Sequence, residues 1–393
     1  MPDTASVSNN IRQYDAPPNS GKLSSIEMFA GGGGLLLGGE AAGISTKATF
    51  ERDSHSCVTL RKNLHKFIDV HESDVRDIDF SAFGGVDVIT GGPPCQPFSS
   101  GGKGLAYDDQ RDMFPQAVRA VREARPRAFI FENVKGLTRS AFKDYFSYIV
   151  FQMSYPTMVS TPTEDWKEHY QRLKAHTETN EPEYVVKTQL VNAADFGVPQ
   201  QRHRIFFVGI RSDIEARWEG IFQTHSLRSL AWNKAHGSYW DRHEIPVSER
   251  MLNRREEAAL RKMKYPPLEM PWKTVRDTIS DLPAPCAINP TGWENHVLQK
   301  GARSYPGHTG SLLDEPSKAL KAGVHGVPGG ENMIRLFDGS VRYFTIREAA
   351  RIQTFPDTHV LHGSWSEAMR QLGNAVPVEL ARVVCDSVCD VLK

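Results

Sequence analysis

The sequence predicts an α/β protein with a mostly parallel sheet and a second, smaller lobe. Three observations support this prediction. In the first half, short apolar or β-branched runs alternate with helical patterns, as in a sheet whose strands are joined by crossover helices. Each run is followed by glycine, proline or a charged residue, which is typical of the end of a strand. With 393 residues, the chain is also too long for one small core.

The predicted strands lie at residues 24–29, 47–50, 86–90 and 127–131. A helix is predicted over residues 35–42, directly after the glycines that follow the first strand. A crossover helix ends before Pro126 and has an apolar face at helical spacing. That face consists of Met113, Phe114, Ala117, Val118, Val121 and Ala124. Because ligands bind beyond the carboxyl ends of parallel strands, the residues that follow the strands are the candidate site.

Glycines follow the first strand and an acid follows the second. Gly31 to Gly34 have no side chains, so a ligand can approach the backbone amides there. Glu51 follows Gly31 by 20 residues, about the interval at which an acid binds ribose hydroxyls. The glycines are not followed by G-K-[ST], which excludes a phosphate-binding P-loop. A nucleoside-bearing cofactor is therefore predicted, with NAD among the candidates on these residues alone.

Cys95 lies in the stretch GGPPCQPFS, residues 91–99, where prolines stiffen the loop after a strand. The chain has five cysteines and no C-x-x-C pair, which argues against a disulfide framework or a zinc site. A buried, inert cysteine is the ordinary interpretation, but this thiol is held at the ligand edge of the sheet. A nucleophilic thiolate needs positive charge nearby, which Arg202 and Arg204 could supply unless they are surface residues.

Together these stretches closely resemble the C5-cytosine DNA methyltransferase family, which uses S-adenosylmethionine. The matching stretches, in order, are FAGGGG (29–34), Glu51, DV (74–75), GGPPCQPFS (91–99), ENV (132–134), QQRHR (200–204), RYFTIREAARIQTFP (342–356) and GNAVP (373–377). The resemblance covers most of the chain, and the order of its motifs makes it specific. It implies a Rossmann-like S-adenosylmethionine-dependent methyltransferase domain with a smaller target-recognition domain.

The resemblance also implies a catalytic set. Because cytosine C5 is a poor nucleophile, the Cys95 thiolate is expected to add to C6 and activate the ring. Glu132 resembles the family carboxyl that binds N3 and the exocyclic amine. Arg204 resembles the arginine that holds O2, and Arg202 its neighbour near the thiol and the target phosphate. The target base must be flipped out of the duplex, and residues 99–112 resemble the family's mobile loop. No side chain is assigned as the base that removes the C5 proton, and water is a candidate.

For the cofactor, the resemblance places Glu51 on the ribose, Asp74 on the adenine amine and Phe114 against the adenine. Arg52 departs from the family, where many members have an apolar or aromatic residue, although its guanidinium could stack on the adenine. No metal ion is expected. The full expected cofactor set is Phe29, Ala30, Gly31, Gly33, Gly34, Glu51, Arg52, Asp74, Val75, Gly92, Phe114, Asn374 and Val376.

The expected domains are a flexible N-terminal tail (1–20), a catalytic and cofactor-binding domain (21–210), a small domain with the target-recognition region (211–355) and a C-terminal segment that returns to the catalytic domain (356–393). Residues 160–183 are predicted to form a surface helix and loop, with a role in DNA contact left open. Residues 321–332 are predicted to form either a recognition loop or a connecting turn.

The charge of the chain bears on its partners. Lys and Arg number 47 and so do Asp and Glu, so any attraction to DNA must be local. Residues 201–264 contain 13 Lys and Arg against 8 Asp and Glu, with tryptophan and tyrosine between them. This is either a solvated face or, as the resemblance implies, a surface for double-stranded DNA. No apolar run is long enough to span a bilayer, so no membrane contact is expected.

The polar start of the chain lacks the apolar core of a signal peptide, so a cytoplasmic protein is expected. The resemblance implies a bacterial, nucleoid-associated one. Monomeric action and a cognate restriction endonuclease that acts on the same site are family-level expectations. Three alternatives stay open. A tRNA cytosine-5 methyltransferase would keep the catalytic residues, a nicotinamide-dependent dehydrogenase would use only the glycines and Glu51, and a catalytically dead DNA-binding regulator would need a lesion that the sequence does not have.

Overall fold

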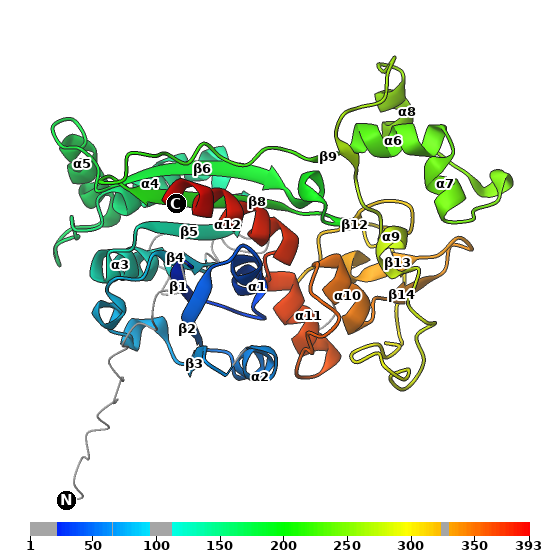
Figure 1. The fold of residues 1–393 in the computed structure, drawn as a ribbon, viewed down its shortest axis with the longest axis horizontal. Coiled ribbons are helices and arrows are strands. Elements are labelled where there is room, and N and C mark those ends of the chain that lie inside the picture. The colour runs from blue at the N-terminus through cyan, green and yellow to red at the C-terminus, as the bar shows by residue number, and fades with distance from the viewer. Residues whose placement is uncertain (1–21, 65, 95–111, 324–329) are drawn as a thin grey trace, which may run out of the picture.

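The computed structural model describes residues 22–64, 66–94, 112–323 and 330–393. Its centre is a seven-stranded sheet with the order β3-β2-β1-β4-β5-β8-β6, in which β8 runs antiparallel to the other six strands (Figure 1). The strands are β1 (Ser24–Met28), β2 (Ser45–Glu51), β3 (Asp69–Glu72), β4 (Val88–Gly91), β5 (Ala128–Val134), β6 (Tyr184–Asn192) and β8 (His203–Arg211). The predicted α/β class and the four predicted strands are confirmed.

Helices cover both faces of this sheet. One face packs against α1 (Gly34–Ala41) and α12 (Val378–Leu392), and the other against α3 (Phe114–Ala124) and α4 (Lys143–Ser154). The helix α2 (Ser54–Asn63) follows β2, and α5 (Trp166–His176) packs on the outside of α4. The helices expected at 35–42 and before Pro126 are thus confirmed as α1 and α3, and the surface helix within 160–183 as α5.

The second lobe combines short helices and short strands. A core of apolar side chains lies between α9, α10 and α11, and a smaller cluster lies under α6 and α7. The helices are α6 (Leu227–Ala235), α7 (Ser238–Arg242), α8 (Arg254–Leu260), α9 (Val275–Ile279), α10 (Ile346–Ile352) and α11 (Trp365–Asn374). The strands are β9 (His225–Ser226) with β10 (Met270–Pro271), β11 (Ser311–Leu312) with β13 (Met333–Arg335) and β14 (Val341–Tyr343), and β12 (Ser317–Lys318) with β7 (Gln200–Gln201).

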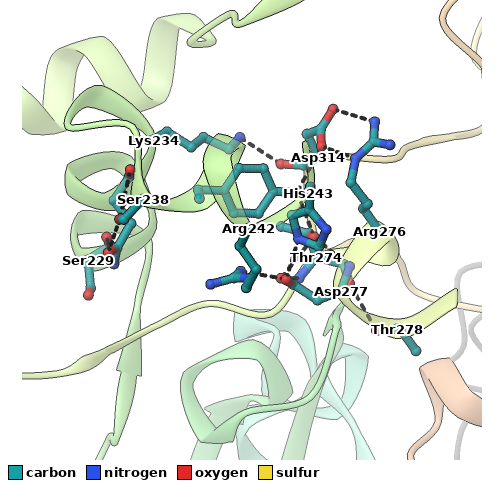
Figure 2. A network of polar contacts seen from close by, with 12 residues as sticks. Ser229, Lys234, Ser238, Arg242, His243, Thr274, Arg276, Asp277, Thr278 and Asp314 are labelled. Atoms are coloured by element: carbon teal, nitrogen blue, oxygen red, sulfur yellow. Dashed lines mark hydrogen bonds and ion pairs between the residues drawn. The ribbon is translucent and has the colours of Figure 1, made fainter. Parts of the chain in front are cut away.

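A polar network rather than a large apolar core joins α6 and α7 to the rest of the second lobe (Figure 2). Asp314 accepts two hydrogen bonds from Arg276, at 2.7 and 3.1 Å, and one from the Tyr239 hydroxyl at 2.8 Å. The buried ammonium of Lys234 pairs with Glu256 at 2.5 Å and donates to the Asp314 carbonyl at 2.6 Å. Because these groups are largely buried, removing Glu256 would take away the charge partner of Lys234, and removing Arg276 would take away that of Asp314.

The β7–β12 pair connects the two lobes, because β7 precedes β8 of the main sheet and β12 belongs to the second lobe. Figure 1 shows α6, α7 and α8 at one end of the molecule and α5 at the other. In the part of the chain that the structure describes, no helix combines the length and apolar character needed to cross a membrane.

Candidate active site

The turn between β1 and α1 has the backbone shape that its glycines predict. Gly31 and Gly33 have φ angles of +53° and +86°, in the left-handed region that favours glycine. At Gly34 the reason is space, since a side-chain carbon would lie 2.2 Å from the Val376 carbonyl oxygen. The C-terminal motif therefore contacts the glycine turn directly, as the sequence predicts.

Glu51, at the end of β2, holds this edge together. Its Oε2 accepts from the Gly31 amide at 2.8 Å, and its Oε1 accepts from the amides of Arg52 and Asp53 at 2.8 and 2.7 Å. A carboxylate offers about four acceptor directions, so three amides leave room for one more donor, on Oε2. A ribose hydroxyl could donate to that position, so the Glu51 carboxylate suits a nucleoside.

Asp74 begins the turn after β3, and its carboxylate is engaged. Arg76 donates to both of its oxygens, at 2.9 and 2.6 Å, and this contact lowers the pKa of Asp74 to about 2. The Arg52 guanidinium lies 3.7 Å from the same carboxylate while most of its side chain is exposed. Arg52 and Asp74 are thus brought together at the predicted adenine edge, beside the buried Val75.

The remaining predicted cofactor residues are placed as follows. Phe114, at the first position of α3, is fully buried with its ring edge-to-face on Phe207. Asn374 is exposed at the end of α11, two residues before the buried Val376. Gly92 lies against the catalytic side of the site, because a side-chain carbon there would be 3.3 Å from Glu132 Oε2.

Glu132 and Arg204 form a buried ion pair at the carboxyl end of β5. The strands β5 and β8 pair so that Val134 faces Arg204, and the Arg204 Nε lies 2.5 Å from Glu132 Oε1. Only 8% of the Glu132 side chain and 12% of the Arg204 side chain are exposed. Burial raises the pKa of Glu132 above its ordinary value, while the charges of Arg204 and Arg202 act in the opposite direction. This carboxyl can therefore hold a proton more readily than an exposed glutamate can.

Arg202 is buried in the wall behind this pair. Its Nη1 donates to the Leu320 carbonyl at 3.0 Å, and its Nη2 donates to the carbonyls of Gly373 and Ala375 at 2.6 and 3.0 Å. From its motif, this arginine was expected near the thiol and the target phosphate. Its two terminal nitrogens bond the second lobe and the C-terminal motif to the residue directly before β8, and its charge acts on Glu132 from within the wall. The expected place beside the thiol and the phosphate stays a prediction.

The segment that leads to Cys95 is held from two sides. Asn133, next to Glu132, donates to the Pro93 carbonyl at 2.9 Å, and the Met113 amide donates to the Pro94 carbonyl at 3.1 Å. Cys95 itself and most of the 99–112 stretch lie outside the described residues, as do the tail 1–20 and part of 321–332. The last described residue before this gap is Pro94, which follows the residue that Asn133 holds next to Glu132.

Two residues that hold parts of the site in place, Asn133 and Arg370, were not predicted from the sequence. Asn133 stands in the quoted ENV motif, and a polar residue inside a buried strand was a signal for it. Arg370 donates to Asp53, the N-cap of α2, at 2.8 Å, although 317 positions separate them. A contact of that sequence separation leaves no local pattern. Among the described residues, no group of three or more histidine, cysteine or acidic side chains could hold a metal ion.

Known proteins are similar to this chain over most of its length. The family model described as C-5 cytosine-specific DNA methylase matches residues 23–155 and 164–389. Type II methyltransferase M.PspPI of Psychrobacter sp. (strain TA137) is 32% identical, over 93% of this chain and 78% of the relative. Type II methyltransferase M.Eco47II of Escherichia coli is 31% identical, over 100% of this chain and 82% of the relative.

The fold has solved counterparts as well. The structure of a putative DNA modification methyltransferase encoded within a prophage (E. coli) covers 94% of this chain and 99% of its own, with a TM-score of 0.57 and 20% identity. This likeness supports the fold, and the sequence comparisons support the activity. The chain belongs to the C-5 cytosine-specific DNA methylase family, and its enzyme class is DNA (cytosine-5-)-methyltransferase.

Proposed function

We propose that Cys95, Glu132 and Arg204 carry out methyl transfer to C5 of a cytosine flipped out of double-stranded DNA at a specific site. The observation that carries this proposal is the buried Glu132–Arg204 pair, with Pro93 and Pro94 fixed beside it. The pair presents a carboxyl of raised pKa and a guanidinium in a largely water-free wall. Such a pair suits a planar base that has a ring nitrogen next to a carbonyl oxygen.

In this mechanism the Cys95 thiolate adds to C6, and the electron pair of the C5–C6 bond becomes available at C5. Glu132, in its protonated form, donates to N3, and Arg204 donates to O2, so both stabilise the charge that the addition places on the ring. Arg202 adds a positive charge behind them. S-adenosylmethionine supplies the electrophilic methyl group that C5 accepts. Loss of the C5 proton then expels the thiolate and restores the aromatic ring.

The described residues suit that cofactor. Glu51 keeps one acceptor direction for a ribose hydroxyl, and Arg52 and Asp74 lie together at the adenine edge. We propose that the glycine turn at 29–34 receives the methionine part and that Asn374 and Val376 close the site. Gly92 and Phe114 complete the set, at the catalytic wall and under the adenine respectively.

We further propose that α8 and the residues after it contact the DNA backbone. Arg254, Arg255, Arg261, Lys262 and Lys264 are exposed, and none of them forms an ion pair within the described ranges. Of the two acids between them, Glu256 is buried against Lys234 and only Glu257 is exposed, so the basic residues outnumber the exposed acid on this surface. Arg255 donates to Gln201 at 3.4 Å, which places the helix next to β7 and hence near Arg202. Exposed basic charge without ion-pair partners among the described residues, next to β7, favours a polyanion.

The same proposal includes the cellular setting. We propose the domain division at about residues 210 and 355, monomeric action on DNA in the bacterial cytoplasm at the nucleoid, and a functional pairing with a restriction endonuclease for the same site. The Type II methyltransferase names of the relatives support that pairing.

The test is covalent trapping. The protein is incubated with S-adenosylmethionine and a library of duplexes that carry 5-fluorocytosine, whose fluorine blocks the final loss from C5. We expect an adduct at Cys95 by mass spectrometry, no adduct with Cys95→Ser, and trapping slowed about 100-fold with Glu132→Gln. Trapping of labelled tRNA with no adduct on any duplex would replace the DNA assignment with a tRNA cytosine-5 methyltransferase.

A further inference from the structure

An aromatic cluster lies between α4 and α5, where the family match stops at residue 155 and resumes at 164. The Tyr145 ring of α4 lies edge-to-face on Trp166 of α5, with a centroid separation of 5.4 Å. Tyr148, one turn further along α4, lies 5.7 Å from the same Trp166 ring. The side chains of Tyr145 and Tyr148 are both buried, so α5 fixes their rotamers by packing.

The two tyrosines direct their hydroxyls to different partners. Tyr148 bonds to His169 of α5 at 2.9 Å, and His169 in turn donates to the Met158 carbonyl at 2.8 Å. That contact stays within the α4–α5 layer. The Tyr145 hydroxyl instead donates to the carboxylate of Asp112, which lies outside this layer and directly before α3.

Asp112 connects this layer to the catalytic edge. Its Oδ1 accepts from the Phe114 amide at 3.1 Å, so the carboxylate caps α3, whose own N-cap residue Met113 makes no side-chain cap. The Met113 amide donates to the Pro94 carbonyl at 3.1 Å. Position 112 therefore fixes the contact that holds Pro94, the last described residue before Cys95.

We propose that Tyr145 is a positioning residue of the methyltransferase. Its hydroxyl orients Asp112, Asp112 sets the start of α3, and the Met113–Pro94 contact then fixes Pro94, the residue before the proposed nucleophile. The helix α5 supports this function by packing Trp166 on the Tyr145 ring. The inference rests on the proposed function, because it assigns the catalytic nucleophile to the residue after Pro94.

The test compares Tyr145→Phe with Tyr148→Phe as a matched control. Each variant removes one hydroxyl from a buried ring on the same helix, and only the first removes the bond to Asp112. We expect Tyr145→Phe to lower kcat and the rate of 5-fluorocytosine trapping about tenfold, with KM for S-adenosylmethionine and DNA within twofold of wild type. Tyr148→Phe should shift Tm by about as much as Tyr145→Phe does, and it should leave the trapping rate unchanged.

Asp112→Asn serves as a second variant, because it keeps the aromatic packing and weakens the same bond. If the two groups act as a pair, Tyr145→Phe combined with Asp112→Asn should trap no more slowly than the slower single variant. Equal trapping rates for both tyrosine variants, or a rise in KM with unchanged kcat, would overturn the proposal. Failure of the wild-type protein to form any adduct would instead overturn the proposed function, so the two failures are distinguishable.

Discussion

Glu27 is a buried carboxyl in β1, the strand that leads to the glycine turn. It accepts a hydrogen bond from the Thr90 hydroxyl at 3.0 Å and another from the Leu36 amide near the start of α1. Burial is the largest influence on it and raises its pKa from 4.5 to about 8, with a smaller contribution from Glu40. The folded protein therefore holds a proton at Glu27 at neutral pH, and the unfolded chain does not.

This difference predicts a pH dependence of stability. Below about pH 4.5 both states are protonated, and between pH 4.5 and 8 only the folded state is, so the free energy of unfolding falls as pH rises through this window. The slope from this one group is up to about 1.4 kcal/mol per pH unit. Glu27→Gln, which keeps an acceptor oxygen, should gain stability relative to wild type as pH rises from 5.5 to 8.

Urea unfolding at several pH values measures this effect, with the exposed Glu178→Gln as control. If the free energy of unfolding depended on pH in the same way for wild type and Glu27→Gln, the Glu27 carboxyl would be ionised in the folded protein.

For single residues, the sequence predicted functional roles but not the structural contacts that the same side chains make in the fold. Glu51 was predicted as a ribose ligand, and the structure adds three backbone amides that its carboxylate ties together. Arg202 was predicted from its motif, but its carbonyl partners at 320, 373 and 375 depend on the tertiary fold. Glu27 was not predicted, because one acid in an apolar strand looks like an ordinary exposed position.

At the scale of elements, the contact between α1 and α12 determines how the C-terminal motif reaches the cofactor turn. A side-chain carbon on Gly38 would lie 2.3 Å from the Ala381 Cβ and 2.6 Å from the Arg382 amide nitrogen, and this backbone cannot move aside. On the adjacent Gly39 the nearest atom would be the Cys385 Sγ, at 3.8 Å, which is ordinary packing. The two helices can pack this closely only because position 38 has no side chain.

These neighbouring glycines make a matched pair. Gly38→Ala should destabilise the protein by about 1–3 kcal/mol, because overpacking outweighs the gain in helix propensity. Gly39→Ala should stabilise it by up to about 1 kcal/mol. Chemical denaturation of both variants checks this, and equal effects of the same sign would contradict the close approach of α12.

At the scale of the whole molecule, the net charge of zero hides a polarised surface. The exposed basic residues after α8 lie in the second lobe, while α5 lies at the opposite end of the molecule (Figure 1). Lys262→Gln with Lys264→Gln should therefore weaken DNA binding and reduce the slope of log K against log salt by about 0.9 for each phosphate that the variant no longer neutralises.

Lys167→Gln with Lys174→Gln, in α5, removes the same charge from exposed positions at the far end and should leave the slope unchanged. Fluorescence anisotropy at several salt concentrations measures both double variants. If log K fell with log salt at the same slope for both double variants, the lysines after α8 would not contact DNA phosphates more than the lysines of α5 do.

The first lobe was predictable and the second was not, for a physical reason. Strands such as β1 and β5 are short apolar runs that end next to glycines or at an acid, so each can be recognised from its own residues, although the order of strands in the sheet differs from their order in the chain. The second lobe instead depends on contacts such as Tyr239 with Asp314 and Arg276 with Asp314, which join polar residues far apart in the chain (Figure 2). Polar residues of this kind look like surface when only neighbours in sequence are known.

The packing of α12 on α1 also constrains biosynthesis. The face of the sheet that α12 covers is formed by residues of β4, β5, β6 and β8, so after β8 is made it stays uncovered until α12 is translated (Figure 1). At about 5–20 residues per second, that interval is roughly 8–33 s. During this time the nascent chain exposes apolar surface and lacks the motif that closes the cofactor turn. A chain that has not yet been translated to residue 376 therefore lacks the contact between the Val376 carbonyl and Gly34.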